Sequence, residues 1–314
     1  TFSLVHLDAH TYQSTKAGLR FSWPRLVDGG ILVLDDLDWR ACPGVRMAIE
    51  ELLPGVEFKV EGQHGWTIKK GKTSENVYWH HGDQGDIMYA LPCVRLLSKD
   101  RPVKLRFYHS DINVRESMTP EKTERLRPLL ELQPYIEDVD FSPMPGSGVI
   151  LDRWRDHPHR PADNLIDIVC AAFKAPRWDH RKPWLVVDEP VHVAPYVVHR
   201  SPRYHRPGFP WKTLLLHKDA CFIGSRDEHR VFCRDYLHVP YHPTPTALDL
   251  ARTIAGSVCF LGNQSFPLSV AHGLAHNVRV EECIPVPNCH LERPNARYNP
   301  FERMKKNDTR TQNG

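Results

Sequence analysis

HHGDQGDIMYALP, residues 80–92, is the stretch from which the fold can be read. An apolar run, VYW at 77–79, precedes it, and a second apolar run, IMYAL, occupies 87–91. The pattern predicts a buried strand, a glycine-bearing loop and then a helix that begins near Asp86. Two carboxylates, Asp83 and Asp86, therefore lie where a strand ends and a helix begins.

A carboxylate at the N-terminus of a helix faces free backbone amides and the positive end of the helix dipole. An ionised Asp86 held there beside a substrate hydroxyl could act as a general base. The alternative is that Asp86 only caps its own helix, as aspartates commonly do. The residues alone leave both interpretations open.

The alternation of apolar runs and helical spacing continues in both directions along the chain. Such alternation is typical of α/β proteins in which helices cover both faces of a parallel sheet. Within it we expect strands at 184–187 and 238–241, and a terminal hairpin formed by 57–60 and 66–68. The expected segments are an α/β block at 1–70, a linker at 71–76, two Rossmann-like lobes at 77–188 and 189–294, and a disordered tail at 295–314.

Composition excludes several classes of protein. The 314 residues carry a net charge of +3, which gives no case for a nucleic-acid or membrane surface. The eight cysteines contain no CxxC pair, so we expect reduced, mostly buried thiols rather than a zinc ribbon or a disulfide framework. No apolar run approaches the roughly 18 residues of a membrane span. With no signal peptide in view, the cytoplasm is the expected compartment, and whether Thr1 is the natural start is left open.

Three aspartates in the first block end apolar runs. Asp8 follows LVHL, and Asp35 and Asp36 follow GGILVL. Ligands of open α/β sheets bind at the carboxyl ends of the strands, and three carboxylates there could hold Mg²⁺. The alternative is again that these aspartates cap the helices that follow.

The first block, LVHLDAHTYQSTKAGLRFSWPRLVDGGILVLDDLDWRACPGVRMAIEELL, resembles the C-terminal half of a class I S-adenosylmethionine-dependent O-methyltransferase of the macrocin-methyltransferase type. The resemblance covers residues 2–70 and implies metal roles for Asp8, Asp35 and Asp36. The second aspartate of the family's LDAD motif, taken to be its base, is His10 here. The glycine-rich half that binds S-adenosylmethionine would lie upstream, so we expect this block to be inert as it stands.

GDQGDIMYALPCVRLL resembles the opening turn of glycosyltransferase family 9, the heptosyltransferase group, which reads GDxxxxLPxxxxL. The resemblance spans about residues 77–290. Aligning 85–86 and 91–92 to the pattern implies that Asp86 is the catalytic aspartate. Asp83 has no counterpart, and we expect it to be solvated.

The same resemblance extends to the third block. VVHRSPRYHRPGFPWKTLL is similar to the family's loop that contacts donor phosphates, and it implies that Arg203 and Lys212 bind a diphosphate, together with Arg200 and Arg206. CFIGSRDEHRVFC is similar to the turn whose glutamate holds the donor ribose, here Glu228. The alternatives are a solvated basic loop and an exposed residue in the first turn of a helix.

LARTIAGSVCFLGNQSFPLSVAHGLAHNVRVEEC is similar to the family's strand, DTGxxH-like turn and helix, where a phosphate would sit on the helix N-terminus. Asn263, Gln264 and Ser265 occupy the turn and are the implied donor-binding residues. Asn263 replaces an aspartate of the family and Leu268 replaces its histidine, which leaves the donor undetermined. His272, one turn later, either substitutes in part or packs within the helix.

Taken together, the sequence predicts two Rossmann-like lobes of the GT-B type preceded by a partial methyltransferase sheet. We expect an inverting glycosyltransferase that uses a nucleotide-sugar donor and a glycan, lipid-linked or other hydroxyl acceptor, with no nucleic-acid partner. The alternatives are an O-methyltransferase fragment with magnesium-binding carboxylates, completed elsewhere, and an inactive sugar-nucleotide-binding or scaffold protein.

Overall fold

The computed structural model describes residues 2–69, 76–110, 117–160 and 163–299. The chain forms two compact units. The first comprises Thr1–Asp83, Arg101–Thr123 and Ile136–Asp152; the second comprises Gln84–Asp100, Glu124–Tyr135 and Arg153–Gly314. These two units do not follow the domain boundaries expected at 76/77 and 188/189. Those domain boundaries stay predictions. The expected linker lies outside the described residues apart from residue 76.

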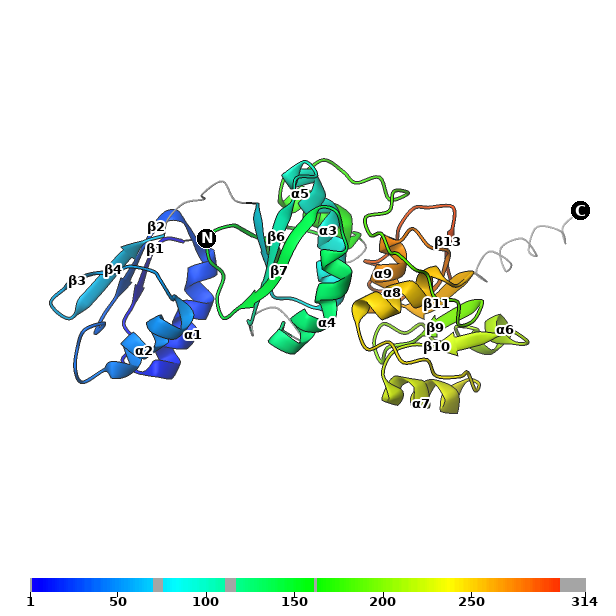
Figure 1. Cartoon of the computed structure of the whole chain (residues 1–314). Coiled ribbons are helices and arrows are strands. Elements are labelled where there is room, and N and C mark those ends of the chain that lie inside the picture. Colours follow the sequence, from blue (N-terminus) through cyan, green and yellow to red (C-terminus); the bar gives the residue numbers. More distant parts are fainter. Residues whose placement is uncertain (1, 70–75, 111–116, 161–162, 300–314) are drawn as a thin grey trace, which may run out of the picture. The chain divides into compact units, whose positions relative to one another are not determined.

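The first unit contains a small mixed sheet built by the N-terminal block (Figure 1). Its strands are β1 (Phe2–Leu7), β2 (Leu26–Leu34), β3 (Lys59–Glu61) and β4 (His64–Ile68), in the order β1-β2-β4-β3. β1 and β2 are parallel, and β3 and β4 form the predicted antiparallel hairpin. The helices α1 (Tyr12–Ser22) and α2 (Pro43–Leu52) pack on each other, with the short 3₁₀ turn η1 (Trp23–Arg25) after α1.

The helices and strands of this block pack around one hydrophobic cluster, to which Met144 from the loop after β7 also contributes. Leu19 from α1, Leu34 from β2 and Leu52 from α2 are buried in one cluster. Lys69 is also buried, and its ammonium donates to the backbone oxygens of Trp23 and Leu26 at 2.9 Å each. A buried ammonium requires such partners. The partial sheet expected from the sequence is therefore a packed structure in its own right.

The second sheet of the first unit is entirely parallel. Its strands are β5 (Val77–His80), β6 (Val103–Tyr108), β7 (Ile136–Ser142) and β8 (Val149–Ile150), in the order β7-β6-β5-β8. Every residue of β5 is buried, as expected of a central parallel strand. The loop after β7 reaches the N-terminal block, where Trp23 Nε1 donates to the Pro145 oxygen at 3.1 Å.

The second unit holds a five-stranded parallel sheet. Its strands are β9 (Tyr196–His199), β10 (Ala220–Phe222), β11 (Cys259–Asn263), β12 (Val278–Glu281) and β13 (Ala296–Tyr298), in the order β10-β9-β11-β12-β13. Its helices are α3 (Gln84–Ser98), α5 (Leu165–Ala172), α6 (Trp211–Leu215), α7 (Arg226–Asp235), α8 (Ala247–Ala255) and α9 (Phe266–Gly273). α4 (Pro120–Glu131) and the 3₁₀ segment η2 (Leu151–Asp156) have residues in both units. α3 packs against α5 and α9.

Most predicted elements are present, and the chain is a mixed α/β protein with parallel sheets, but three expectations are wrong. Residues 184–187 form no strand, because the Trp184 and Leu185 amides donate to the Gly273 oxygen instead of to a sheet. Residues 238–241 contribute only an isolated bridge between Tyr241 and Phe222. Part of the expected disordered tail is ordered: β13 pairs with β12, and only 300–314 lie outside the described residues.

Two expectations from composition can be compared with the structure. All eight cysteines are free thiols and six are buried, as predicted. Within the described ranges, no helix is both long enough and apolar enough to cross a membrane.

The buried carboxylate of Glu281 organises one edge of the five-stranded sheet. Glu281 ends β12 and has no exposed surface. It accepts hydrogen bonds from Arg200 Nε at 2.7 Å, Arg200 Nη2 at 3.1 Å, the Arg206 amide at 3.0 Å and Trp211 Nε1 at 3.2 Å. Without such partners, a buried carboxylate would cost several kcal/mol. The charge therefore holds the loop after β9 and the start of α6 against β12.

Substitution Glu281→Gln tests this role. The amide leaves the nearly buried guanidinium of Arg200 opposite a neutral group, so we expect a loss of about 3 kcal/mol in the free energy of unfolding. Urea denaturation followed by circular dichroism measures it. Glu292→Gln, at an exposed carboxylate, is the control and should change stability by less than about 0.5 kcal/mol. Equal unfolding midpoints for Glu281→Gln and the unaltered protein would contradict the role.

His276, between α9 and β12, makes stability depend on pH. Burial lowers its pKa from 6.5 to about 4. The folded state thus holds a neutral imidazole where the unfolded chain binds a proton. The contribution to stability is complete above pH 6.5 and is lost as the pH falls toward 4.

We therefore expect the protein to be less stable at pH 5 than at pH 7. His276→Gln should reduce that difference by about 2 kcal/mol, because glutamine does not titrate. Urea denaturation at the two pH values measures the effect. If the variant and the unaltered protein lose stability equally between pH 7 and pH 5, the assignment to His276 is wrong.

Candidate active site

The first turn of α3 carries the carboxylate that the sequence singled out. Asp86 lies in this turn, and its side chain is 22% exposed. Arg155 Nη2 donates to Asp86 Oδ2 at 2.5 Å, and the guanidinium lies over the Trp154 ring, 4.5 Å from its centroid. Asp86 is therefore an oriented, partly accessible carboxylate, and its role as a base stays a prediction.

The residues just before this turn are fixed by a second aspartate, in the first unit. Asp152 is buried and accepts a hydrogen bond from the His81 amide at 2.8 Å. The ring of His80 lies 3.3 Å from the same carboxylate and accepts from the Gly82 amide at 2.9 Å. Sequence reasoning missed Asp152 and Arg155. Their only signal was the alternation of charge in LDRWRD, which resembles many exposed loops.

The N-terminus of α9 is the second half of the candidate site. Ser265 precedes α9 in an extended conformation, and its hydroxyl donates to the Asn263 oxygen at 3.0 Å rather than accepting from the helix amides. The first turn of α9 therefore receives no side-chain cap. Amides in that position, with the helix dipole behind them, attract anions.

The first turns of α3 and α9 lie next to each other within the second unit. A methyl group on Gly85 would lie 3.9 Å from the Phe266 nitrogen and 4.0 Å from Ser269 Oγ. Gly85 precedes Asp86, and Phe266 follows Ser265. The fold thus brings Asp86 and Ser265, which are 179 positions apart in the sequence, into one neighbourhood.

Asn263 and Gln264 face inward instead of toward a ligand. Asn263 is fully buried: its Oδ1 accepts from the Ser201 amide at 2.9 Å, and its Nδ2 donates to the Ser201 and Arg203 oxygens. Gln264 donates to the Val286 oxygen at 2.7 Å and accepts from the Cys283 amide at 2.8 Å. These side chains hold two loops, 201–203 and 283–288, around the start of α9. Direct contact of these two side chains with a donor stays a prediction.

The other implied donor-binding residues come from three different segments of the second unit. Arg203 is half-buried in the loop after β9, and Lys212 is exposed at the start of α6. Glu228 forms a capping box with Ser225, accepting from its amide and hydroxyl at 2.8 Å each, and its Oε1 lies 4.0 Å from His199 Nε2. Arg200 is neutralised by Glu281, so the expected group of four cations is smaller than the sequence suggested.

His272 packs within α9 and does not substitute for a ligand-binding histidine. It is fully buried and bonded by the hydroxyls of Tyr89 and Tyr298 at 2.9 and 3.2 Å. Burial, with Arg293 nearby, holds its pKa well below the usual value. A neutral, enclosed imidazole cannot reach a ligand at the start of the helix. Of the two alternatives left open, packing is confirmed.

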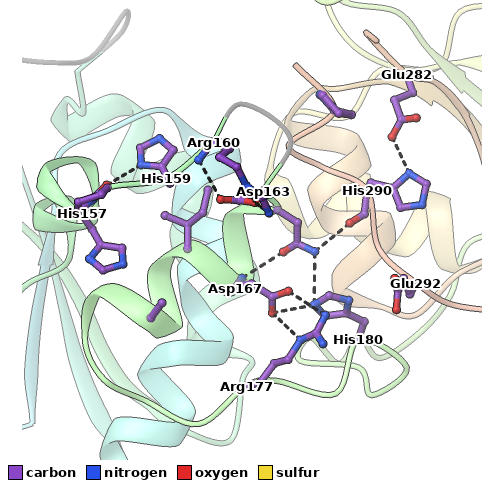
Figure 2. Close-up of a pocket in the computed structure, with 15 residues that line it drawn as sticks. His157, His159, Arg160, Asp163, Asp167, Arg177, His180, Glu282, His290 and Glu292 are labelled. Atoms are coloured by element: carbon purple, nitrogen blue, oxygen red, sulfur yellow. Dashed lines mark hydrogen bonds and ion pairs between the residues drawn. The ribbon is translucent and has the colours of Figure 1, made fainter. Parts of the chain in front are cut away.

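A polar cavity of about 640 Å³ lies in the same unit, between the start of α5 and the loop at 282–292. Asp167 pairs with both Arg177 and His180 (Figure 2), with nitrogen–oxygen distances of 3.1 Å in each case. Burial opposes ionisation of Asp167, but these two partners hold its pKa below the usual range. The Asn164 side chain caps α5 and donates to the His290 oxygen at 2.9 Å. Sequence reasoning missed this cavity because its residues are spread over more than 130 positions.

The three N-terminal carboxylates do not form the predicted magnesium site. Asp35 is paired with His64, whereas buried Asp36 accepts from His10 Nδ1 at 2.5 Å. Asp8 lies 3.6 Å from the same nitrogen. The Asp36 hydrogen bond, and then the Asp8 charge, raise the pKa of His10. Among the described residues, the group whose ligand atoms all lie within 4.8 Å of one another is His10, Asp36 and Cys42.

Comparison with known proteins gives a likeness at the level of solved structures. No family model matches the chain, and no curated protein sequence matches it. The heptosyltransferase WaaC of E. coli with ADP-2-deoxy-2-fluoro heptose is 10% identical, with 71% of this chain and 92% of that chain covered and a TM-score of 0.41. A family 9 glycosyl transferase from Veillonella parvula is 10% identical, with 77% of this chain and 93% of that chain covered and a TM-score of 0.49. The iron-containing dodecameric glycosyltransferase TibC of enterotoxigenic E. coli is 14% identical, with 76% of this chain and 72% of that chain covered and a TM-score of 0.45. At this level, the likeness transfers no residue role to this chain.

Asn263→Asp tests the structural role of the turn before α9. A carboxylate at this buried position cannot donate to the Ser201 and Arg203 oxygens, so we expect the free energy of unfolding to fall by about 3 kcal/mol. Urea denaturation measures the change. The control is Asn277→Asp, because Asn277 is exposed and donates only to the Val258 oxygen among the bonds described. A loss no larger than that of the control would show that Asn263 does not hold the loop.

Proposed function

We propose that this protein transfers a sugar from a nucleotide-sugar donor to a hydroxyl acceptor with inversion, as a GT-B-type glycosyltransferase. One observation carries the proposal: the first turn of α3, with Asp86, lies beside the uncapped first turn of α9. The pair offers a base and an anion-binding helix end in one neighbourhood. Inverting glycosyl transfer needs both groups.

The donor diphosphate would sit at the N-terminus of α9. The amides of Phe266 and Leu268 would hold its oxygens, because Pro267 between them has no amide hydrogen, and the Ser265 hydroxyl would join them by turning away from the Asn263 oxygen. Arg203 and Lys212 would add positive charge from the neighbouring loop and α6. Glu228 would accept hydrogen bonds from the donor ribose. Asn263 and Gln264 would act indirectly, by holding the loops at 201–203 and 283–288 in place.

Asp86 would act as general base. Its carboxylate takes the proton of the acceptor hydroxyl while that oxygen bonds to the anomeric carbon. The bond from this carbon to the diphosphate oxygen breaks on the opposite face, and the nucleoside diphosphate leaves with the electron pair. Arg155 would orient the carboxylate for this step. Donors aimed at the leaving group contribute on the order of 3–4 kcal/mol each to such transition states.

The polar cavity of Figure 2 would receive part of the acceptor. His157 lines it and follows Arg155, the partner of Asp86, by two residues. The lining carries carboxylates, imidazoles and guanidinium groups, which hydrogen-bond well to a hydroxyl-rich molecule. We do not extend the proposal to magnesium or S-adenosylmethionine, because Asp8, Asp35 and Asp36 do not converge on one point.

A non-catalytic sugar-nucleotide-binding protein is the second candidate. The internal bonding of Asn263 and Gln264, and the burial of Leu268, leave few side chains to contact a donor at the start of α9. Such a protein would bind a nucleotide sugar without turning it over.

Asp86→Asn separates these functions. The amide cannot take a proton, so we expect release of the nucleoside diphosphate to fall by roughly 100-fold or more. Affinity for the donor should change less than about threefold, since the base contacts the acceptor. The measurements are calorimetry with ADP-, GDP- and UDP-sugars and release of nucleoside diphosphate from the donor that binds.

Asp83→Asn is the matched control, because it removes a half-buried carboxylate from the residue immediately before α3, three positions from Asp86. Its turnover should stay within about threefold of the unaltered protein. No nucleotide sugar bound at millimolar concentration would refute both candidates. Binding without turnover in the unaltered protein would select the second, and a large loss of donor affinity in Asp86→Asn would contradict the base role.

A further inference from the structure

The N-terminal block gathers side chains of mixed ligand type at the carboxyl ends of β1 and β2. His10 follows β1, Asp36 follows β2, and Cys42 immediately precedes α2. One ligand atom from each lies within 4.8 Å of the other two. Asp8 lies beside them, with Oδ1 at 3.6 Å from His10 Nδ1.

Two features of the backbone bring this group together. Asp36 has a φ of 58°, a left-handed conformation that an aspartate adopts more readily than most residues. This conformation turns the chain as β2 ends, and the Asp36 side chain is buried, with 4% of its surface exposed. Cys42 stands before Pro43, the first residue of α2, and is also largely buried.

The donor set decides which cation fits. Mg²⁺ prefers oxygen ligands in octahedral geometry. Of the three carboxylates predicted to supply them, that of Asp35 is paired with His64 instead. An imidazole nitrogen, a thiolate and a carboxylate suit Zn²⁺ and related borderline ions instead. Three such protein ligands with an accessible fourth position are typical of zinc sites that keep one position open.

Access and spacing are compatible with an ion. The side chains of His10 and Asp8 are 61% and 54% exposed, so a hydrated ion can approach from solvent. Ligands around tetrahedral Zn²⁺ stand about 3.3–3.8 Å apart, given metal–ligand distances of about 2.0–2.3 Å. The His10–Asp36 pair must therefore open by roughly 1 Å, which the exposed His10 ring allows by rotation.

We infer that His10, Asp36 and Cys42, with Asp8 or water in the fourth position, form a binding site for Zn²⁺ or a related transition-metal ion. The site is independent of the function proposed for the second unit. It replaces the magnesium site that the sequence predicted, in the same block but with a different donor set and a different class of ion.

The test is calorimetric titration of the full reduced chain with Zn²⁺, with Mg²⁺ and Co²⁺ in parallel. We expect one Zn²⁺ to bind at this site, Mg²⁺ at millimolar concentration not to displace it, and Co²⁺ to give the absorption band of a cobalt–thiolate bond. His10→Ala should weaken Zn²⁺ binding at least roughly tenfold. Cys42→Ser should do the same and abolish the cobalt–thiolate band.

Matched controls separate this site from the other histidines and cysteines of the chain. His6→Ala removes another exposed imidazole of the same sheet, and Cys283→Ser removes a partly exposed thiol of the second unit. Both should keep the affinity and the band. Circular dichroism of each variant without metal checks its fold, and His10→Ala, at an exposed side chain, keeps the test open if Cys42→Ser fails to fold.

Three results would overturn the inference. The first is a Zn²⁺ affinity that is unchanged in both His10→Ala and Cys42→Ser. The second is displacement of Zn²⁺ by Mg²⁺ at comparable concentration. The third is a cobalt–thiolate band that persists in Cys42→Ser but disappears in Cys283→Ser. The last result would place the thiolate ligand in the second unit.

Discussion

Glu281 carries a charge in the interior of the second unit, and much of the surrounding backbone follows from the need to satisfy it. Removing a carboxylate from water costs several kcal/mol unless donors replace the lost hydration. Here the donors come from the loop after β9 and from the start of α6. The same loop is bonded from β11 through Asn263. The carboxyl edge of this parallel sheet, where ligands of such sheets bind, is thus shaped by hydrogen bonds between distant segments.

The position of this edge also explains why the N-termini of α3 and α9 lie next to each other. α9 leaves the sheet directly after β11, so its amides are at the carboxyl edge, and α3 packs against α9 with Gly85 at the close approach. A methyl group at Gly85 would only touch the first turn of α9, at 3.9 Å from the Phe266 nitrogen, so the two turns lie in van der Waals reach of each other. One turn presents a carboxylate held by Arg155, and the other presents amides that no side chain caps. Opposite electrostatic character on adjacent turns is what a reaction that moves a proton and releases an anion requires.

The N-terminal block shows how the partners of a few side chains decide which ion a group of residues suits. Its hairpin lies where the sequence predicts, and one hydrophobic cluster stabilises its strands and helices. The carboxylate of Asp36 is hydrogen-bonded to the imidazole of His10, and the carboxylate of Asp35 is paired with the imidazole of His64. Among the described residues, the ligand atoms that lie within 4.8 Å of one another are those of His10, Asp36 and Cys42. The fold of the block therefore does not determine which ion the block suits, because that depends on how the side chains at the strand ends are paired.

The sequence by itself determined the local elements and the two turns that matter. Apolar periodicity predicted β5 and α3, since side-chain burial repeats along a strand or helix within a few residues, and the resemblance implied β11 and α9. The turn residues Asp86 and Ser265 came from the same local patterns and from the resemblance they carry. Only the tertiary structure decided their partners: Arg155 is 69 positions from Asp86, and Arg200 is 81 positions from Glu281. It also decided that Asn263 faces inward and that Asp35 meets His64. Periodicity reports which face of an element is buried, whereas an ion pair between distant residues depends on how separate elements pack, and no local pattern records that.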